Sequence, residues 1–199
     1  MILSSIFILI SNENNILNNQ HSDRYKLIES LKKRNIKIFE KEEFECDFYN
    51  SIDKENIIKG YIINSDYSKR EVAIKRVMLI PDHDQILSEI ELLNEFKNNP
   101  HFVNFYGVYI EETKNIILIF LELLCMNLRK FLDKKSIKKE EKLSICRELL
   151  ECILVLHSKG IIHRDLKPEN ICFDQFMKLK LIHFGKIYII KDHLLDQIL

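Results

Sequence analysis

One short polar stretch combines residue types that could do chemistry. Residues 160–174 read GIIHRDLKPENICFD, with an apolar run on either side of the polar part. The charged or polar residues within 163–170 are His163, Arg164, Asp165, Lys167, Glu169 and Asn170. Charged side chains are costly to bury unless they are paired or used in a reaction, so this stretch indicates a candidate site. The simpler alternative is a solvated loop that joins two buried elements.

The length and net charge of the chain limit the size of its fold and the kinds of partner that such a site could bind. With 199 residues, the chain is long enough for one domain with a real core or for two small lobes. Lys and Arg together number 30, and so do Asp and Glu. Because no net field attracts polyanions, we expect neither nucleic acid nor a membrane surface as a partner.

The cysteines indicate free thiols rather than a metal site or a disulfide framework. They are Cys46, Cys125, Cys146, Cys152 and Cys172, and no two of them form a CxxC pair. Such an odd and scattered set is typical of a reducing compartment. Cys146 and Cys152 lie in an apolar helical pattern, so we expect both to be buried.

The first ten residues, MILSSIFILI, form an apolar stretch. It is well short of the roughly 20 residues that span a bilayer, and it has no basic segment before it that would indicate a signal peptide. We expect a strand or an ordered hydrophobic tail here, then an Asn-rich loop at 12–23. With no targeting signal visible, the cytoplasm is the default expectation.

Hydrophobic spacing predicts the elements that must position the polar stretch. Helical spacing is found at 23–39, 82–99 and 138–160, and strand-like runs are found at 55–64, 70–79, 101–110, 115–124, 170–174 and 178–185. Each successive pair of these strands is expected to form a hairpin. The predicted order is therefore strand pair, helix, strand pair, helix, polar loop and hairpin.

Each predicted helix has apolar residues that share one face. In the first two helices these residues are Leu27, Ile28, Leu31, Ile86, Ile90, Leu93 and Phe96. In the third helix they are Leu143, Cys146, Leu150, Ile153 and His157. Gly160 is expected at the position just after the end of that helix.

Three motifs together carry a resemblance to a known family. HRDLKPEN at 163–170 resembles the catalytic loop of Ser/Thr-type eukaryotic protein kinases, VAIK ends at Lys75 on a predicted strand, and Glu89 lies in the next helix. The resemblance covers about 44–186. It implies an α+β, protein-kinase-like fold with a β-rich N-lobe at 44–124 that contains one helix. An incomplete helical C-lobe at 125–199 follows, and 1–43 is an N-terminal extension.

The resemblance also implies ATP and Mg²⁺ as cofactors and a protein as substrate or partner. Asp165 would orient the substrate hydroxyl as the catalytic base, and Lys167 would contact the transferred phosphate. Asn170 would hold one Mg²⁺ through its amide oxygen. Lys75 would contact the α- and β-phosphates while paired with Glu89. The alternative for this pair is a purely structural ion pair.

The resemblance implies supporting roles for two other residues of the motif. His163 would pack beneath the loop, and Arg164 normally binds a phosphate on the activation segment. The family also stacks an internal hydrophobic column. In this chain its members would be Leu93, Phe105, His163 and Phe184.

The sequence departs from the family at three places. Where the family has the Mg²⁺-binding Asp-Phe-Gly, this chain has His183, Phe184 and Gly185, and imidazole is a poor ligand for Mg²⁺. The glycine-rich loop would fall at about Asn50, Ile52 and Glu55, and none of these is glycine. Finally, the sequence ends 14 residues after Gly185, before the rest of the family's second lobe.

These departures leave three hypotheses: an active Ser/Thr kinase, a non-catalytic pseudokinase that binds a partner, and a truncated fragment. Loss of one preorganised electrostatic group commonly lowers a rate by roughly 10²–10³. We therefore expect ATP-dependent phosphorylation by this chain to be very weak or absent. We also expect the third predicted helix to expose an apolar face that the missing lobe would otherwise cover.

Overall fold

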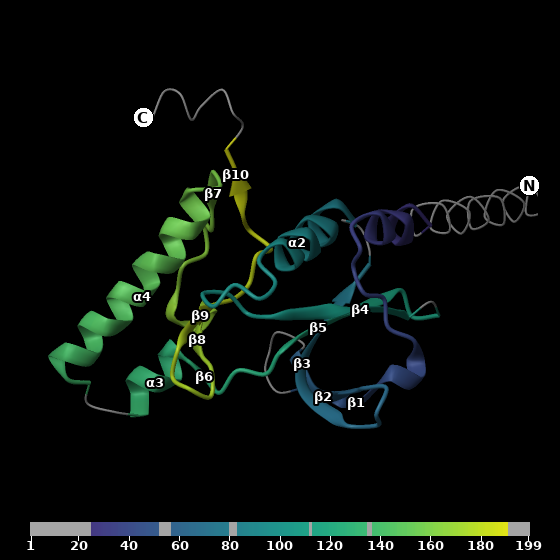
Figure 1. Ribbon diagram of the computed structural model, residues 1–199, viewed down its shortest axis with the longest axis horizontal. Helices are drawn as coiled ribbons and strands as arrows, with labels where there is room; N and C mark the ends of the chain where they lie inside the picture. The colour runs from purple at the N-terminus through teal and green to yellow at the C-terminus, as the bar shows by residue number, and fades with distance from the viewer. Residues whose placement is uncertain (1–24, 52–56, 80–82, 112, 135–136, 191–199) are drawn as a thin grey trace, which may run out of the picture.

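The computed structural model describes residues 25–51, 57–79, 83–111, 113–134 and 137–190 (Figure 1). The expected apolar tail and Asn-rich loop before residue 24 lie outside these ranges. The same is true of Ile52 and Glu55 in the expected phosphate loop.

A five-stranded antiparallel sheet forms the first half of the molecule, with strand order β1-β2-β3-β5-β4. Its strands are β1 (Phe44–Ser51), β2 (Ile57–Ile63), β3 (Lys69–Met78), β4 (Phe105–Glu111) and β5 (Ile116–Glu122). Alternation along β2 buries Ile58 and Ile62, while Lys59 points to solvent. Both hairpins predicted in this region, β2–β3 and β4–β5, are confirmed.

Helix α2 (His83–Glu95) lies against one face of this sheet (Figure 1). All four residues predicted for its inner face are buried: Ile86, Ile90, Leu93 and Phe96. They belong to the larger of two hydrophobic clusters, which continues into the second half of the molecule. A smaller cluster, which includes Phe44, Phe120 and Val72, covers the other face of the sheet.

The segment before β1 packs onto α2 and β4. Residues 25–33 are helical, and the predicted Leu27 and Leu31 are only 3% and 0% exposed. Arg34 Nε lies 2.7 Å from Glu91 Oε1 on α2. Farther along, Ile38 forms a parallel bridge to Val108 of β4. Figure 1 shows this first helix beside α2, so the segment and the sheet share one core.

Gly107 explains how that segment comes so close to the sheet. Its φ is +149°, and a Cβ at this position would lie 2.5 Å from the carbonyl oxygen of Lys37. No side chain fits in this space, so glycine allows the backbone of the N-terminal segment to pair with β4.

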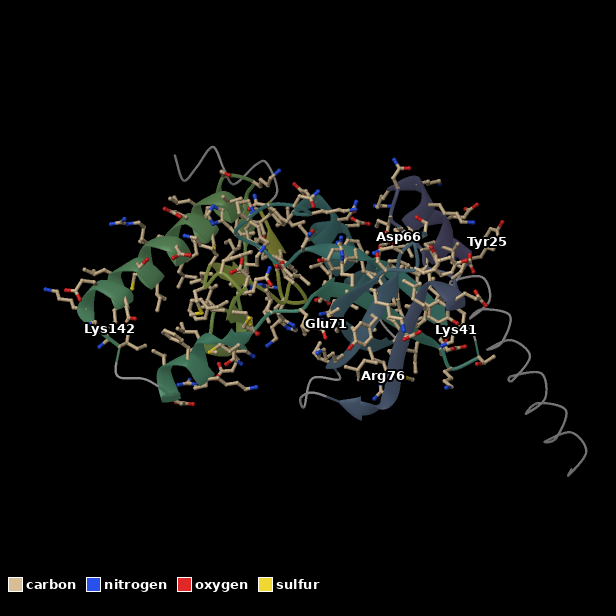
Figure 2. All side chains as sticks on the ribbon, turned by 60° about the horizontal axis from the view of Figure 1, so that its bottom comes forward. Tyr25, Lys41, Asp66, Glu71, Arg76 and Lys142 are labelled. Atoms are coloured by element: carbon tan, nitrogen blue, oxygen red, sulfur yellow. The ribbon has the colours of Figure 1, made fainter. Side chains whose placement is uncertain are left out.

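The second half of the molecule has one long helix and several short elements. They are β6 (Met126–Asn127), α3 (Leu128–Lys134), α4 (Lys139–His157), β7 (Ile161–Ile162), the 3-10 turn η2 (Pro168–Asn170), β8 (Ile171–Phe173), β9 (Leu179–Leu181) and β10 (Tyr188–Ile189). A second 3-10 turn, η1 (Lys41–Glu43), precedes β1 in the first half. The β8–β9 hairpin and α4 confirm predictions, whereas α3 was not predicted. Figure 2 shows Lys142 of α4 at the opposite end of the molecule from Tyr25 and Lys41.

The face of α4 that packs inward is not the apolar face listed from its spacing. Leu143 and Leu150 are 58% and 59% exposed, and Cys146 is also exposed. The buried side chains are instead Cys152 and Leu156, so the expectation of burial holds for only one of the two helix cysteines. Because α4 has apolar residues around most of its circumference, spacing alone could not identify the side that packs on β7 and β9.

An exposed apolar surface on α4 was nevertheless expected, and it is present. Leu154 is 66% exposed on the same helix as Leu143 and Leu150. After α4 the chain turns at Gly160, whose φ of +69° agrees with the predicted glycine after the helix end. Of the helices in the described ranges, none is long and apolar enough to cross a membrane.

Candidate functional site

A cavity of about 400 Å³ lies between the five-stranded sheet and the second half of the molecule. Its apolar walls are formed by Ile57, Ala73, Val103, Leu121, Cys172 and Ile182. Lys75, Glu89 and His183 also line it, so the cavity joins an apolar space to charged groups. Such a combination is typical of a site for a small ligand with an apolar part and a polar part.

The segment after β5 borders this cavity with its main chain. Leu123, Leu124 and Cys125 all line the cavity. The amide of Cys125 donates to the carbonyl of Phe173 at 2.9 Å. Among the described residues, no backbone hydrogen bond outside the helices and strand ladders uses the amide or carbonyl of Leu124. These groups can therefore serve a planar ligand that offers both a donor and an acceptor.

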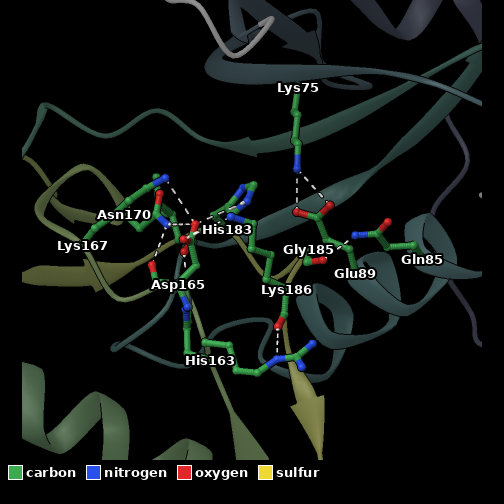
Figure 3. A network of polar contacts seen from close by, with 12 residues as sticks. Lys75, Gln85, Glu89, His163, Asp165, Lys167, Asn170, His183, Gly185 and Lys186 are labelled. Atoms are coloured by element: carbon green, nitrogen blue, oxygen red, sulfur yellow. Dashed lines mark hydrogen bonds and ion pairs between the residues drawn. The ribbon is translucent and has the colours of Figure 1, made fainter.

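Lys75 and Glu89 form a close ion pair at one side of the cavity (Figure 3). The Nζ atom of Lys75 on β3 lies 2.7 Å and 2.9 Å from the two carboxylate oxygens of Glu89 on α2. Their side chains are only 17% and 10% exposed. Strand pairing of β3 with β2 and β5 fixes Lys75, and the buried face of α2 fixes Glu89, so the pair connects helix to sheet.

His163 supports the polar loop from below. The side chain is 2% exposed, and its Nε2 lies 3.1 Å from the carbonyl oxygen of Ile182. The amide of Asp165 donates to Nδ1 at 3.3 Å, which places the ring hydrogen on Nε2. Burial lowers the pKa of His163, so the ring is neutral near pH 7. Its role as a packing residue agrees with the sequence-based interpretation.

Asp165 lies at the centre of a dense network of polar contacts (Figure 3). The side-chain amide of Asn170 donates both to the Asp165 carbonyl and to Oδ2, each at 2.8 Å. Lys167 Nζ lies 3.3 Å from Oδ2, and Lys186 Nζ lies 3.3 Å from Oδ1. Burial by itself would raise the pKa of Asp165, but hydrogen bonds from these three side chains outweigh it and lower the pKa to about 2.

Arg164 connects the loop to the segment that follows Gly185. Its φ is +59°, and its Nε donates to the carbonyl of Lys186 at 2.7 Å. Its guanidinium also lies over the ring of Tyr188, 5.4 Å from the ring centre. Tyr188 belongs to β10, which pairs with β7. Arg164 therefore holds the backbone of Lys186 next to Asp165.

His183 occupies the place where the family has a carboxylate. Its Nε2 lies 4.0 Å from Asp165 Oδ2, and its φ is +69°. The next residue, Phe184, is 2% exposed and packs against Phe96, Phe102 and His163 with ring centres 5.8–6.0 Å apart. After it, the carbonyl of Gly185 accepts a hydrogen bond from Gln85 of α2 at 2.6 Å.

The members of the predicted internal column are all buried. Leu93, Phe105, His163 and Phe184 are each at most 2% exposed. Leu93, Phe105 and Phe184 belong to one hydrophobic cluster, and His163 contacts Phe184. The structure thus brings together Lys75 and Glu89 in one group, and Asp165, Lys167, Asn170 and His183 in another. Sequence reasoning missed Lys186, because no motif includes it and its position depends on the hydrogen bond from Arg164 to its carbonyl.

The described residues offer little for a divalent cation. In these ranges there is no group of three or more His, Cys, Asp or Glu side chains arranged to hold a metal ion. The atoms nearest to such a site are the carboxylate of Asp165 and the amide of Asn170, with the His183 imidazole beside them. Mg²⁺ prefers oxygen ligands, so this donor set does not fit it.

Comparisons with known proteins agree with the geometry. A family model described as the protein kinase domain matches residues 59–195. The mouse phosphorylase b kinase gamma catalytic chain, liver/testis isoform, is 35% identical over 103 residues, which cover 51% of this chain and 25% of the relative. Mitogen-activated protein kinase 15 of Caenorhabditis elegans is 30% identical over 123 residues, covering 59% and 26%.

The alignment with a third relative includes a larger share of this chain. A putative serine/threonine-protein kinase of Acanthamoeba polyphaga mimivirus is 28% identical over 156 residues, which cover 76% of this chain and 28% of the relative. The matched part of this chain thus corresponds to about a quarter of the length of each of these relatives.

Proposed function

Because the chain belongs to the protein kinase family, we propose that it binds ATP in the cavity beside Lys75. We further propose that it transfers phosphate to serine or threonine of proteins very weakly or not at all. The observation that carries the second part is His183, which stands beside Asp165 where a metal-binding carboxylate is expected.

Several contacts support ATP as the ligand. The apolar walls suit a purine ring, and the main-chain groups of Leu124 can pair with its edge. The Lys75 ammonium lies in the same cavity and can contact phosphate oxygens. Its pairing with Glu89 holds this ammonium in a defined position, so little side-chain entropy is lost when a phosphate binds.

The loop residues keep the arrangement that phosphate transfer would use. Asp165 is ionised, and Asn170 holds its carboxylate through Oδ2 and its backbone through the carbonyl oxygen. In this proposal Asp165 would accept the proton of a substrate hydroxyl, and Lys167 would face the transferred phosphate. Both carboxylate oxygens already have cationic or amide donors, so Asp165 is a poor base in this state.

The residues around Asp165 are poorly suited to the Mg²⁺ that the family uses with ATP. Mg²⁺ bound to ATP would neutralise phosphate charge. The residues present do not fit it, because His183 replaces an oxygen donor with an imidazole. The charge that develops on transfer therefore lacks its usual stabilisation, and a loss of roughly 10²–10³ in rate is expected from this change alone.

A phosphotransfer assay tests the proposal. The chain is incubated with γ-labelled ATP, Mg²⁺ and a generic protein substrate, alongside His183→Asp and Asp165→Asn variants. We expect incorporation at the background level for the wild-type chain and a gain for His183→Asp. Clear Mg²⁺-dependent incorporation by the wild-type chain that Asp165→Asn abolishes would show that the enzyme is active and would refute the proposed loss.

A second candidate function is a non-catalytic module that binds a protein partner. The exposed leucines of α4 favour it, since Leu143, Leu150 and Leu154 present an apolar surface that no described residue covers. Nucleotide binding separates the two candidates. A chain that unfolds cooperatively but binds neither ATP nor adenosine would support the binding module over a nucleotide site.

A further inference from the structure

The side chains around Asp165 do not suit Mg²⁺, and two lysines, Lys167 and Lys186, lie against the same carboxylate. We propose that the cavity binds ATP as the metal-free triphosphate, with the ammonium groups of Lys186 and Lys167 in the role of the divalent cation. This inference rests on the proposed nucleotide site and adds which form of the nucleotide the site selects.

The positions of the two ammonium groups support the proposal. Lys186 Nζ lies 3.3 Å from Asp165 Oδ1, and Lys167 Nζ lies 3.3 Å from Oδ2 of the same carboxylate (Figure 3). They approach Asp165 from two sides, beside His183, which itself lines the cavity. A cation that bridged Asp165 and a phosphate would have to displace one of them, whereas a phosphate could accept from both.

The local charge favours an anion over a cation. At Asp165, two ammonium groups, on Lys167 and Lys186, face one carboxylate. Without counting His183, these three side chains have a net positive charge. A free divalent cation is repelled by this charge, and a triphosphate is attracted. An aspartate at 183 would remove the excess and add an oxygen ligand, which is the condition that suits Mg²⁺.

Lys186 is also held in place by the fold. Arg164 binds its backbone carbonyl at 2.7 Å, and the next residues lead into the β10–β7 pairing. The side chain beyond this anchored backbone is 59% exposed, so its ammonium has room to move away from Asp165. Lys167, at 41% exposed, has similar freedom.

Calorimetric titration of the whole chain with ATP tests the inference. One titration contains EDTA and no divalent cation, a second contains MgCl₂, and a third uses adenosine in place of ATP. We expect ATP to bind in EDTA at least as tightly as in MgCl₂. We also expect ATP in EDTA to bind more tightly than adenosine, because the triphosphate adds contacts to lysine.

The possible failures are distinguishable. ATP binding that needs MgCl₂ would overturn this inference and leave the nucleotide site intact. Adenosine binding without a gain from the triphosphate in EDTA would also overturn it. If neither ATP nor adenosine binds under any condition, the proposed function itself fails, and this inference fails with it.

Variants identify the residues responsible. Lys186→Met should weaken ATP binding in EDTA by about tenfold, the value expected for loss of one charged contact, and should leave adenosine binding unchanged. Lys178→Met is the matched control, because Lys178 is an exposed lysine in the β8–β9 turn and should have no effect. His183→Asp should make ATP bind more tightly in MgCl₂ than in EDTA. Unchanged affinity in Lys186→Met, or no gain from MgCl₂ in His183→Asp, would contradict the assignment.

Discussion

The ion pair between Lys75 and Glu89 provides a quantitative test of how the helix is held to the sheet. The perturbation is a double-mutant cycle of Lys75→Met and Glu89→Gln. At an effective dielectric constant of about 20, two unit charges about 4 Å apart attract by about 4 kcal/mol. Desolvation opposes this gain, but each single variant leaves the other group largely buried and without its partner charge.

We therefore expect each single variant to lose about 3 kcal/mol in free energy of unfolding. The double variant should lose about as much as either single one, which corresponds to a coupling of about 3 kcal/mol. Urea unfolding followed by far-UV circular dichroism measures these values. The chain has no tryptophan, so a fluorescence signal would depend on its 7 tyrosines.

A second ion pair on the same sheet is the matched control. Lys69 lies 2.8 Å from Glu45, but these side chains are 50% and 52% exposed. The cycle of Lys69→Met and Glu45→Gln should give a coupling below about 1 kcal/mol. The reasoning would be refuted if the losses at Lys75 and Glu89 simply added, or if the exposed pair showed a coupling as large as the buried one.

Three further predictions use other parts of the structure. Leu31→Ala should lower the free energy of unfolding by about 2–5 kcal/mol, because Leu31 is 0% exposed between the N-terminal segment and the core. In the same urea assay Tyr25→Ala should change the free energy of unfolding little, because Tyr25 is 67% exposed. Burial lowers the pKa of His163, so as the pH falls the unfolded state binds the proton before the folded state does. The free energy of unfolding measured in urea should therefore decrease as the pH falls below about 6.5. A His163→Phe variant with the same dependence of this free energy on pH would contradict the prediction. ATP should slow the alkylation of Cys125, which is exposed and lines the cavity, but not that of Cys146, which is exposed on α4. Mass spectrometry of iodoacetamide-treated protein measures both rates. Equal protection of the two cysteines would argue against ATP in this cavity.

The sheet and α2 could be predicted well from the sequence because their apolar periodicity matches one buried face. Ile86, Ile90, Leu93 and Phe96 all point inward as their spacing indicates. The α4 helix differs, because it has apolar residues on several sides. Its partner strands decide which side is buried, and that information is not in the local pattern.

The candidate site, too, could be predicted from the sequence only in part. Motif spacing identified Lys75 and Glu89, and the structure places them in contact. It did not identify Lys186, because the position of this residue depends on Arg164 binding a carbonyl 22 residues away. The cavity is lined by segments that are distant in sequence, such as those that contain Ala73 and Cys172, and periodicity reports only on neighbours.

The central claim is that this cavity binds a nucleotide, and a thermal unfolding experiment tests it most directly. The chain is heated with and without ATP at about 100 times its dissociation constant, in EDTA and in MgCl₂. The account predicts stabilisation by about 2.7 kcal/mol in EDTA, which for a chain of this size is an increase of about 5–10 °C in the unfolding midpoint. A cooperative transition whose midpoint is unchanged by ATP in both buffers would contradict it.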